Sequence, residues 1–84
     1  MTLADLLRAQ RRRRFWTQTA LAKEAGVSLN TVQRWEMGMS IPFPAKQQKL
    51  VEVLGVEPEI LLAAIEATEA EKGKAAARVS ALAA

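Results

Sequence analysis

Residues 17–38 read TQTALAKEAGVSLNTVQRWEMG and contain two short helical patterns separated by a glycine. Thr17 is suited to cap the first helix, because its hydroxyl can accept a hydrogen bond from a free N–H group of the first turn. Gly26 follows that helix where a left-handed backbone is needed, and Ser28 is suited to cap the second helix. This order of residues predicts a helix-turn-helix.

The second of these helices has two chemically different faces. Val32 and Trp35 share the face that is predicted to point inward. The other face carries side chains that match base edges, since a guanidinium binds guanine, an amide binds adenine and an apolar group contacts the thymine methyl. The predicted base-reading residues are Ser28, Leu29, Asn30, Gln33 and Arg34.

An ordered set of motifs resembles the Cro-like or XRE-type helix-turn-helix regulators, a family that includes lambdoid phage repressors. The set consists of L-R-A-Q-R at 7–11, W-T-Q at 16–18, L-A-x-x-A-G-V-S at 21–28, T-V-x-R-W-E-x-G at 31–38, I-P at 41–42, K-L-V-E-V-L-G-V at 49–56 and L-L at 61–62. The resemblance covers Leu3 to Leu62. It implies an all-α, five-helix lambda-repressor-like fold whose second and third helices form the helix-turn-helix.

The resemblance also implies roles for residues around this motif. Arg11 matches an arginine that pairs, in the family, with the glutamate matching Glu36, so a structural ion pair is expected. Gln18 matches an amide that holds a DNA phosphate, and a helix N-terminus attracts anions. The predicted phosphate-binding residues are Thr17, Gln18, Thr31, Arg12 and Arg13. For Arg12 and Arg13, a solvated basic face is the alternative.

Composition excludes several classes of site. The chain has 84 residues, a net charge of +3, and neither cysteine nor histidine. Disulfides, thiolate chemistry and a good zinc site are therefore excluded, no metal or cofactor is expected, and an enzyme is the least favoured class because no acid–base or nucleophilic constellation can be assembled. Residues 1–40 hold seven basic and three acidic residues, whereas residues 41–84 hold five and six. The positive charge thus lies in the half with the predicted reading helix.

Helical patterns on either side complete a predicted DNA-binding domain of residues 1–66. The first helix is predicted at Leu3–Arg14, the fourth at Pro44–Leu54, and the fifth begins at Pro58 because proline fits the first turn. The predicted buried stripe of the fifth helix consists of Ile60, Leu61, Ala64 and Ile65. Phe15 stands where many members of the resembled family have glycine, so the turn there is either strained or built differently.

Residues 67–84 form an Ala-rich, charged C-terminal extension. Val79 and Leu82 are its sizeable apolar residues. A helix, a frayed segment and a segment ordered only by a partner are all compatible with this composition. Either the extension or the fifth helix is expected to form the seam of a homodimer.

The predicted function is that of a sequence-specific transcriptional regulator that binds double-stranded DNA at a palindromic operator. Repression is favoured over activation. No apolar run of transmembrane length and no signal-peptide core is present, so a cytoplasmic, nucleoid-associated protein is expected. The alternative is an antitoxin, or another interaction module of the same fold, that binds a partner protein through the extension and represses its own operon. RNA binding is disfavoured because exposed aromatic residues are not interleaved with the arginines.

Overall fold

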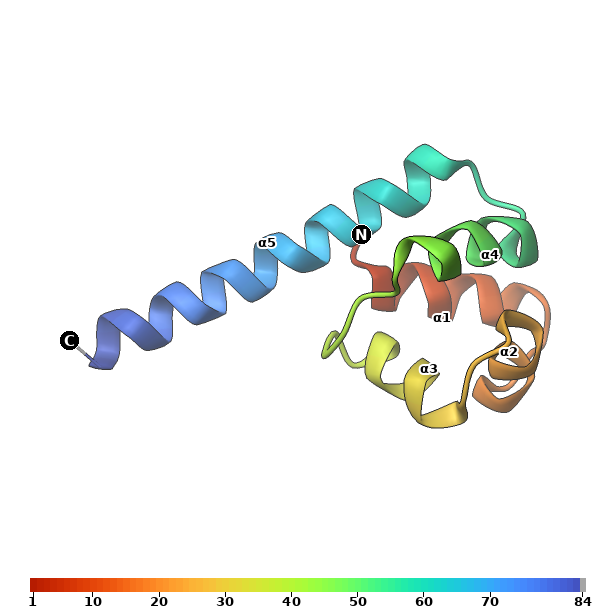
Figure 1. Ribbon diagram of the computed structural model, residues 1–84, viewed down its shortest axis with the longest axis horizontal. Helices are drawn as coiled ribbons and strands as arrows, with labels where there is room; N and C mark the ends of the chain where they lie inside the picture. Colours follow the sequence, from red (N-terminus) through yellow and green to blue (C-terminus); the bar gives the residue numbers. More distant parts are fainter. Residues whose placement is uncertain (84) are drawn as a thin grey trace.

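The computed structural model describes residues 1–83, with side chains as far as Glu71, and this part of the chain is entirely α-helical outside its turns. The helices are α1 (Leu3–Arg13), α2 (Gln18–Ala25), α3 (Leu29–Glu36), α4 (Pro44–Leu54) and α5 (Pro58–Ala83). Helices α1 to α4 form a bundle, and α5 begins on that bundle and continues beyond it (Figure 1). The side chains of Val79 and Leu82 lie outside the described residues.

Local signals place the helix ends close to where the sequence predicts them. Thr2 and Asp5 form a capping box at the start of α1, and Pro44 occupies the first turn of α4. Gly55 ends α4 in the left-handed region, at φ 63°. The all-α, five-helix fold is confirmed, with α1 ending one residue earlier than expected.

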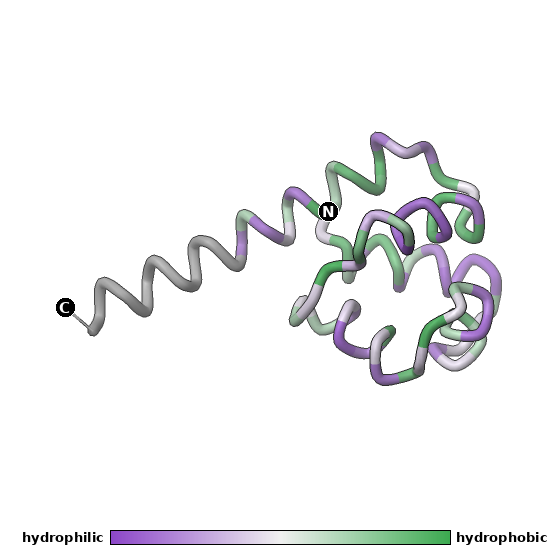
Figure 2. The backbone as a smooth tube through the Cα atoms, viewed as in Figure 1, coloured by the Kyte–Doolittle hydropathy of each residue, from purple (hydrophilic) through white to green (hydrophobic). Residues whose placement is uncertain are grey.

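One hydrophobic core joins the five helices. Helix α1 packs against α3 and α5, while α2 packs against α3 and α4. In α1 to α4, hydrophobic and hydrophilic stretches alternate along the backbone, as in helices with one buried face (Figure 2). The core consists of Leu3, Leu6, Leu7, Leu21, Ala22, Ala25, Val32, Trp35, Leu50, Leu54, Leu61, Ala64 and Ile65.

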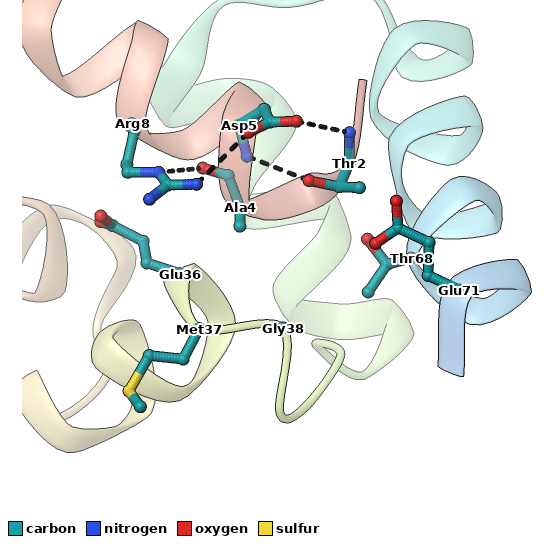
Figure 3. A pocket seen from close by; sticks show the side chains of 9 residues that line it. All are labelled: Thr2, Ala4, Asp5, Arg8, Glu36, Met37, Gly38, Thr68 and Glu71. Atoms are coloured by element: carbon teal, nitrogen blue, oxygen red, sulfur yellow. Dashed lines mark hydrogen bonds and ion pairs between the residues drawn. The ribbon is translucent and has the colours of Figure 1, made fainter. Parts of the chain in front are cut away.

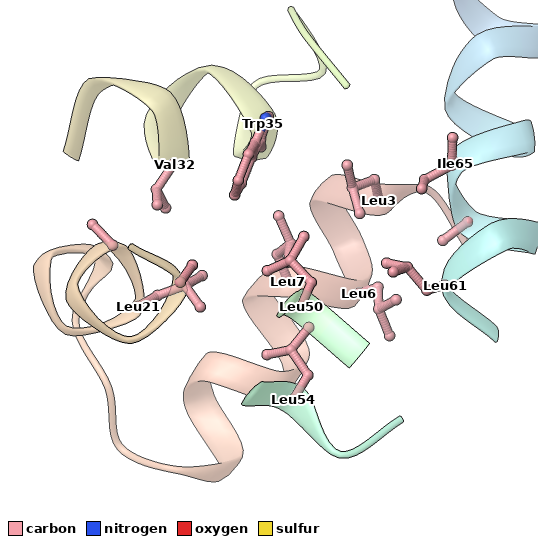
Figure 4. Packing of buried hydrophobic residues seen from close by; sticks show 13 residues of the cluster. Leu3, Leu6, Leu7, Leu21, Val32, Trp35, Leu50, Leu54, Leu61 and Ile65 are labelled. Atoms are coloured by element: carbon pink, nitrogen blue, oxygen red, sulfur yellow. The ribbon is translucent and has the colours of Figure 1, made fainter. Parts of the chain in front are cut away.

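Helix α5 closes the core from the side of α1. Leu61 and Ile65 lie beside Leu3 and Leu6 (Figure 4). The predicted buried stripe was wrong at Ile60, which is 50 % exposed. The buried residues of α5 are spaced three and four apart and therefore share one face of the helix. Ile60, next to Leu61, points toward solvent.

Thr68 extends this contact past the predicted domain end at residue 66. Its hydroxyl accepts a hydrogen bond from the Leu3 N–H at 2.9 Å and donates to the Ala64 carbonyl at 2.9 Å. The Leu3 N–H belongs to the first turn of α1, where no carbonyl of the same helix is available. Thr68 is only 3 % exposed, so it satisfies a buried donor.

The turn between α1 and α2 holds Phe15 in the left-handed region, at φ 57°. The Trp16 N–H donates to the Arg11 carbonyl at 2.9 Å, and the Phe15 N–H donates to the Arg12 carbonyl at 3.1 Å. This is the hydrogen-bond pattern of a Schellman motif. The sequence left two alternatives for this turn, a strained one and one built differently, and the strained turn is observed. The left-handed conformation of Phe15 costs about 1–2 kcal/mol relative to glycine.

Arg14, next to this turn, ties α1 to α4. Its guanidinium donates to the backbone and side-chain oxygens of Gln10 at 3.2 and 2.8 Å, and to the Leu54 carbonyl at the end of α4. It also lies 5.5 Å from the centroid of the Trp16 ring. A cation at a helix C-terminus is stabilised by the helix dipole, so Arg14 contributes to packing.

Candidate nucleic-acid interface

Capping side chains define both helices of the helix-turn-helix. The Thr17 hydroxyl accepts a hydrogen bond from the Ala20 N–H at 3.1 Å, and the Ser28 hydroxyl accepts one from the Thr31 N–H at 3.1 Å. Gly26 ends α2 with φ 71°, a conformation that strains any residue with a side chain. The two caps and the glycine turn therefore stand where the sequence predicts them.

Helix α3 buries one face and exposes the other. Val32 and Trp35 are 0 % and 2 % exposed, so the back of the helix is fixed on the core. The exposed side chains are those of Leu29, Asn30, Gln33 and Arg34. Within the described residues, the side-chain polar groups of Asn30, Gln33 and Arg34 have no hydrogen-bond partner. They are available to base edges.

Ser28 and Thr31 stand at the start of the same face with their hydroxyls 2.9 Å apart. The Ser28 oxygen also accepts a hydrogen bond from the Thr31 N–H, so Ser28 is the N-cap of α3. Thr31 is partly exposed, and its hydroxyl points along the first turn toward Ser28. Ser28 is itself a predicted base-reading residue and Thr31 a predicted phosphate-binding residue, and part of the hydrogen-bonding capacity of both is already used.

Arg11 and Glu36 connect α1 to the end of α3. The Arg11 Nε and Nη2 groups donate to the two Glu36 carboxylate oxygens at 2.9 Å each. Arg11 Nη1 also donates to the Trp16 carbonyl at 3.1 Å, and the Gln18 amide lies 3.4 Å from Glu36 Oε1. The expected ion pair is therefore present, and it also positions the start of α2.

The N-terminus of α2 offers donors to an anion. Thr17 caps it, and no acidic residue lies in its first turn. The backbone N–H groups of Gln18 and Thr19 have no acceptor in the described part of the chain. Arg12 and Arg13 are exposed near the end of α1, without a side-chain partner among the described residues. The N-terminus of α2, with its free N–H groups, attracts a phosphate.

Lys46 is a residue of this surface that sequence reasoning missed. A hollow of about 390 Å³ lies beside α3, and Arg34 and Lys46 line it together with Thr31 and Ser40. Lys46 Nζ donates to the Gly26 carbonyl at 3.2 Å. No motif indicates this, because only the packing of α4 against α2 brings Lys46 to the turn.

A second hollow, of about 770 Å³, lies between α1, the end of α3 and α5 (Figure 3). Its lining contains three acidic residues, Asp5, Glu36 and Glu71, and one basic residue, Arg8. The carboxylates disfavour a phosphate there. The surface of α2, α3 and Lys46 is therefore the better candidate for binding an anion.

The described residues lack two other kinds of site. No group of three or more acidic side chains there is arranged to hold a metal ion. None of the helices in that part is long and apolar enough to span a membrane.

Comparison with known proteins agrees with this geometry. Residues 2–65 match the family model described as a helix-turn-helix domain. No curated protein and no solved structure matches the chain. The family match covers more than half of the sequence and confirms the resemblance noted above. The chain therefore belongs to this helix-turn-helix family, which is of the XRE/Cro-like, DNA-binding type.

Proposed function

We propose that the protein is a sequence-specific regulator of transcription that represses by occupying a duplex operator in the cytoplasm. The supporting observation is the exposed face of α3, where Asn30, Gln33 and Arg34 are unpaired on a helix whose back is buried. A helix fixed in this way enters the major groove as a rigid body. Its side chains then meet base edges without reorganising the domain.

Backbone contacts would hold this helix in register. The N-terminus of α2, with Thr17 and Gln18, takes a phosphate on one side of α3, and Thr31 adds a hydroxyl. Lys46 offers a cation on the other side, beside the hollow that it shares with Arg34. Arg12 and Arg13 add positive charge near the first contact. Such contacts position a protein on DNA, and base contacts specify the sequence.

A homodimer on a palindrome fits the remaining surface. A largely apolar hollow of about 250 Å³ lies between α4 and α5, with Val51, Leu61 and Leu62 among its lining residues. Leu62 is 48 % exposed and Ile60 is 50 % exposed. Burial of these side chains against a second copy would place two reading helices about 34 Å apart, one turn of duplex.

Selection of bound duplexes from a random pool tests the proposal. The expected result is a palindromic consensus whose half-sites lie about one helical turn apart. The Arg34→Ala protein should lose part of that consensus, while Arg8→Ala, in the hollow lined by Asp5, Glu36 and Glu71, should retain it. A pool that stays random after selection would contradict sequence-specific binding.

One observation favours the alternative of an interaction module. Helix α5 continues to Ala83, whereas Thr68 is the last buried residue among the side chains that the structure describes. A helix that extends past its own domain offers a surface to another protein, such as the toxin of an antitoxin pair. A stable complex that forms in the native host only when residues 72–84 are present would support this role.

A further inference from the structure

Phe43 occupies a position where a polar residue would serve the fold better. It is the N-cap residue of α4, but its side chain makes no capping hydrogen bond. Serine, threonine, asparagine and aspartate are preferred at such a position, because their oxygens accept a bond from a helical N–H group. The Phe43 side chain is also 80 % exposed, so the core gains almost nothing from the ring. The fold alone therefore gives no reason for an aromatic residue here.

Phe43 lines the hollow of about 390 Å³ beside α3. The lining contains two basic residues, Arg34 and Lys46, and no acidic one among the described residues. Ser40 adds a hydroxyl that has no hydrogen-bond partner in the described part of the chain, while Pro42 and Phe43 contribute apolar surface. A hollow with a cationic part and an apolar part is complementary to a ligand that joins an anion to an apolar group.

Both parts of this hollow are held in place by the fold. Lys46 Nζ donates to the Gly26 carbonyl at 3.2 Å, which leaves two of its three N–H groups for another acceptor. The loop before α4 is fixed by Gln47, whose amide donates to the Pro42 carbonyl at 2.9 Å. Phe43 is flanked by a proline on each side, and prolines restrict the backbone. Little conformational entropy is therefore lost when a ligand binds.

The hollow adjoins the face of α3 that is proposed to read DNA, because Arg34 belongs to both. With α3 in the major groove, the groups beside it meet the strand that borders the groove. At each nucleotide that strand presents an anionic phosphate next to a deoxyribose, whose 2′ carbon carries no hydroxyl. These two groups match the cationic and the apolar part of the hollow.

We propose that this hollow binds one sugar–phosphate unit of the operator and selects deoxyribose over ribose there. The phosphate accepts hydrogen bonds from Lys46 and Ser40, and the Phe43 ring packs against the sugar. A 2′-hydroxyl on this sugar would lie against the ring, where it loses water and gains no hydrogen-bond partner. This inference rests on the proposed operator binding and adds a residue, Phe43, that distinguishes DNA from RNA.

The test uses the full chain and the duplex obtained by selection, with one nucleotide changed at a time. In one series each deoxynucleotide is replaced by its ribonucleotide, and in the other each phosphate is replaced by an uncharged methylphosphonate. One ribonucleotide and the adjacent methylphosphonate should each lower the affinity of the parent about fivefold or more. Phe43→Ala should abolish the ribonucleotide effect, and Lys46→Gln should abolish the methylphosphonate effect.

Two further variants separate this contact from a structural role. Phe15→Gly is the matched control, because it removes the other phenylalanine, which is 95 % exposed and does not line the hollow. It should keep both effects at the parent's size. Phe43→Ser places a preferred residue at the N-cap, so it should unfold at a higher temperature than the parent and still bind the unmodified duplex less tightly. A purely structural role would move stability and affinity in the same direction.

Three results would overturn the proposal while leaving operator binding intact. One is a selected duplex on which no single ribonucleotide weakens binding. Another is a ribonucleotide effect that persists in Phe43→Ala, and the third is a methylphosphonate effect at the adjacent phosphate that persists in Lys46→Gln. A selection that returns no consensus would instead contradict operator binding itself, and this proposal with it.

Discussion

The carboxylate of Glu36 receives both Nε and Nη2 of Arg11, and the two side chains are only 3 % and 17 % exposed. Two parallel bonds of this kind fix the orientation as well as the distance between the partners. Because the same carboxylate lies near the Gln18 amide, the pair joins α1, the start of α2 and the end of α3. The geometry of the proposed DNA-binding surface thus depends on this contact.

Truncating either member of this pair should destabilise the fold strongly. Arg11→Ala and Glu36→Ala should each lower the free energy of unfolding by about 3 kcal/mol, since the remaining charge is left buried and unpaired. The double variant should cost less than the sum of the two. Urea unfolding of all four proteins gives the coupling energy, and additive losses would contradict the pair.

Arg34 and Lys46 should affect DNA binding in different ways. Arg34→Ala should cost about 1–3 kcal/mol on the selected site and relax the preference at one G·C pair. Lys46→Gln should weaken all duplexes nearly equally and reduce the slope of log affinity against log salt by about 1. Fluorescence anisotropy at several salt concentrations distinguishes the two effects.

Lys49→Gln is the matched control for the lysine, because Lys49 is exposed on the same helix but does not line the hollow. It should leave the salt slope unchanged. A Lys46→Gln protein that behaves like this control would remove Lys46 from the interface. A uniform loss for Arg34→Ala on every sequence would reassign that residue to a phosphate.

Asp5 should make the start of α1 sensitive to acid. Hydrogen bonds from the Thr2 backbone and hydroxyl, with a smaller contribution from Arg8, lower the pKa of Asp5 below its ordinary value of 3.8. The ionised form is therefore favoured in the folded state, and its contribution is present above the unfolded pKa. It is lost as the pH falls through the lowered pKa.

Asp5→Asn provides the comparison. Its urea midpoint should lie below that of the parent at neutral pH, and the difference should vanish once the pH falls below the lowered pKa of Asp5, where the carboxyl is protonated in both states. A difference that persists unchanged at low pH would show that the charge of Asp5 is not its source.

The features that sequence predicts best are those whose causes lie within a few residues. Thr17 and Ser28 bond the N–H group three residues ahead, and Gly26 permits a backbone that other residues resist. Pro44 marks the start of α4 for a similarly local reason. The helix-turn-helix can be found from sequence because it is assembled from such signals.

Contacts between distant helices escape this reasoning. Lys46 reaches the Gly26 carbonyl only after α4 has packed on α2, and Arg14 reaches the Leu54 carbonyl across the same bundle. Ile60 shares an apolar pattern with Leu61, yet packing buries only Leu61. Such outcomes follow from the relative orientation of whole helices, which residue spacing alone does not specify.

The contact between Thr68 and Leu3, 65 residues apart, makes the end of the domain testable by two truncations. A chain ending at Glu71 keeps this hydrogen bond, so it should unfold with nearly the parent's stability and bind a single half-site equally well. A chain ending at Glu66 leaves the buried Leu3 N–H without a partner and should lose about 1–3 kcal/mol. Thr68→Val in the full chain should reproduce that loss, because it removes the hydroxyl and keeps the shape. Thermal unfolding of the four proteins measures the differences, and equal stability of both truncations would return the domain boundary to residue 66.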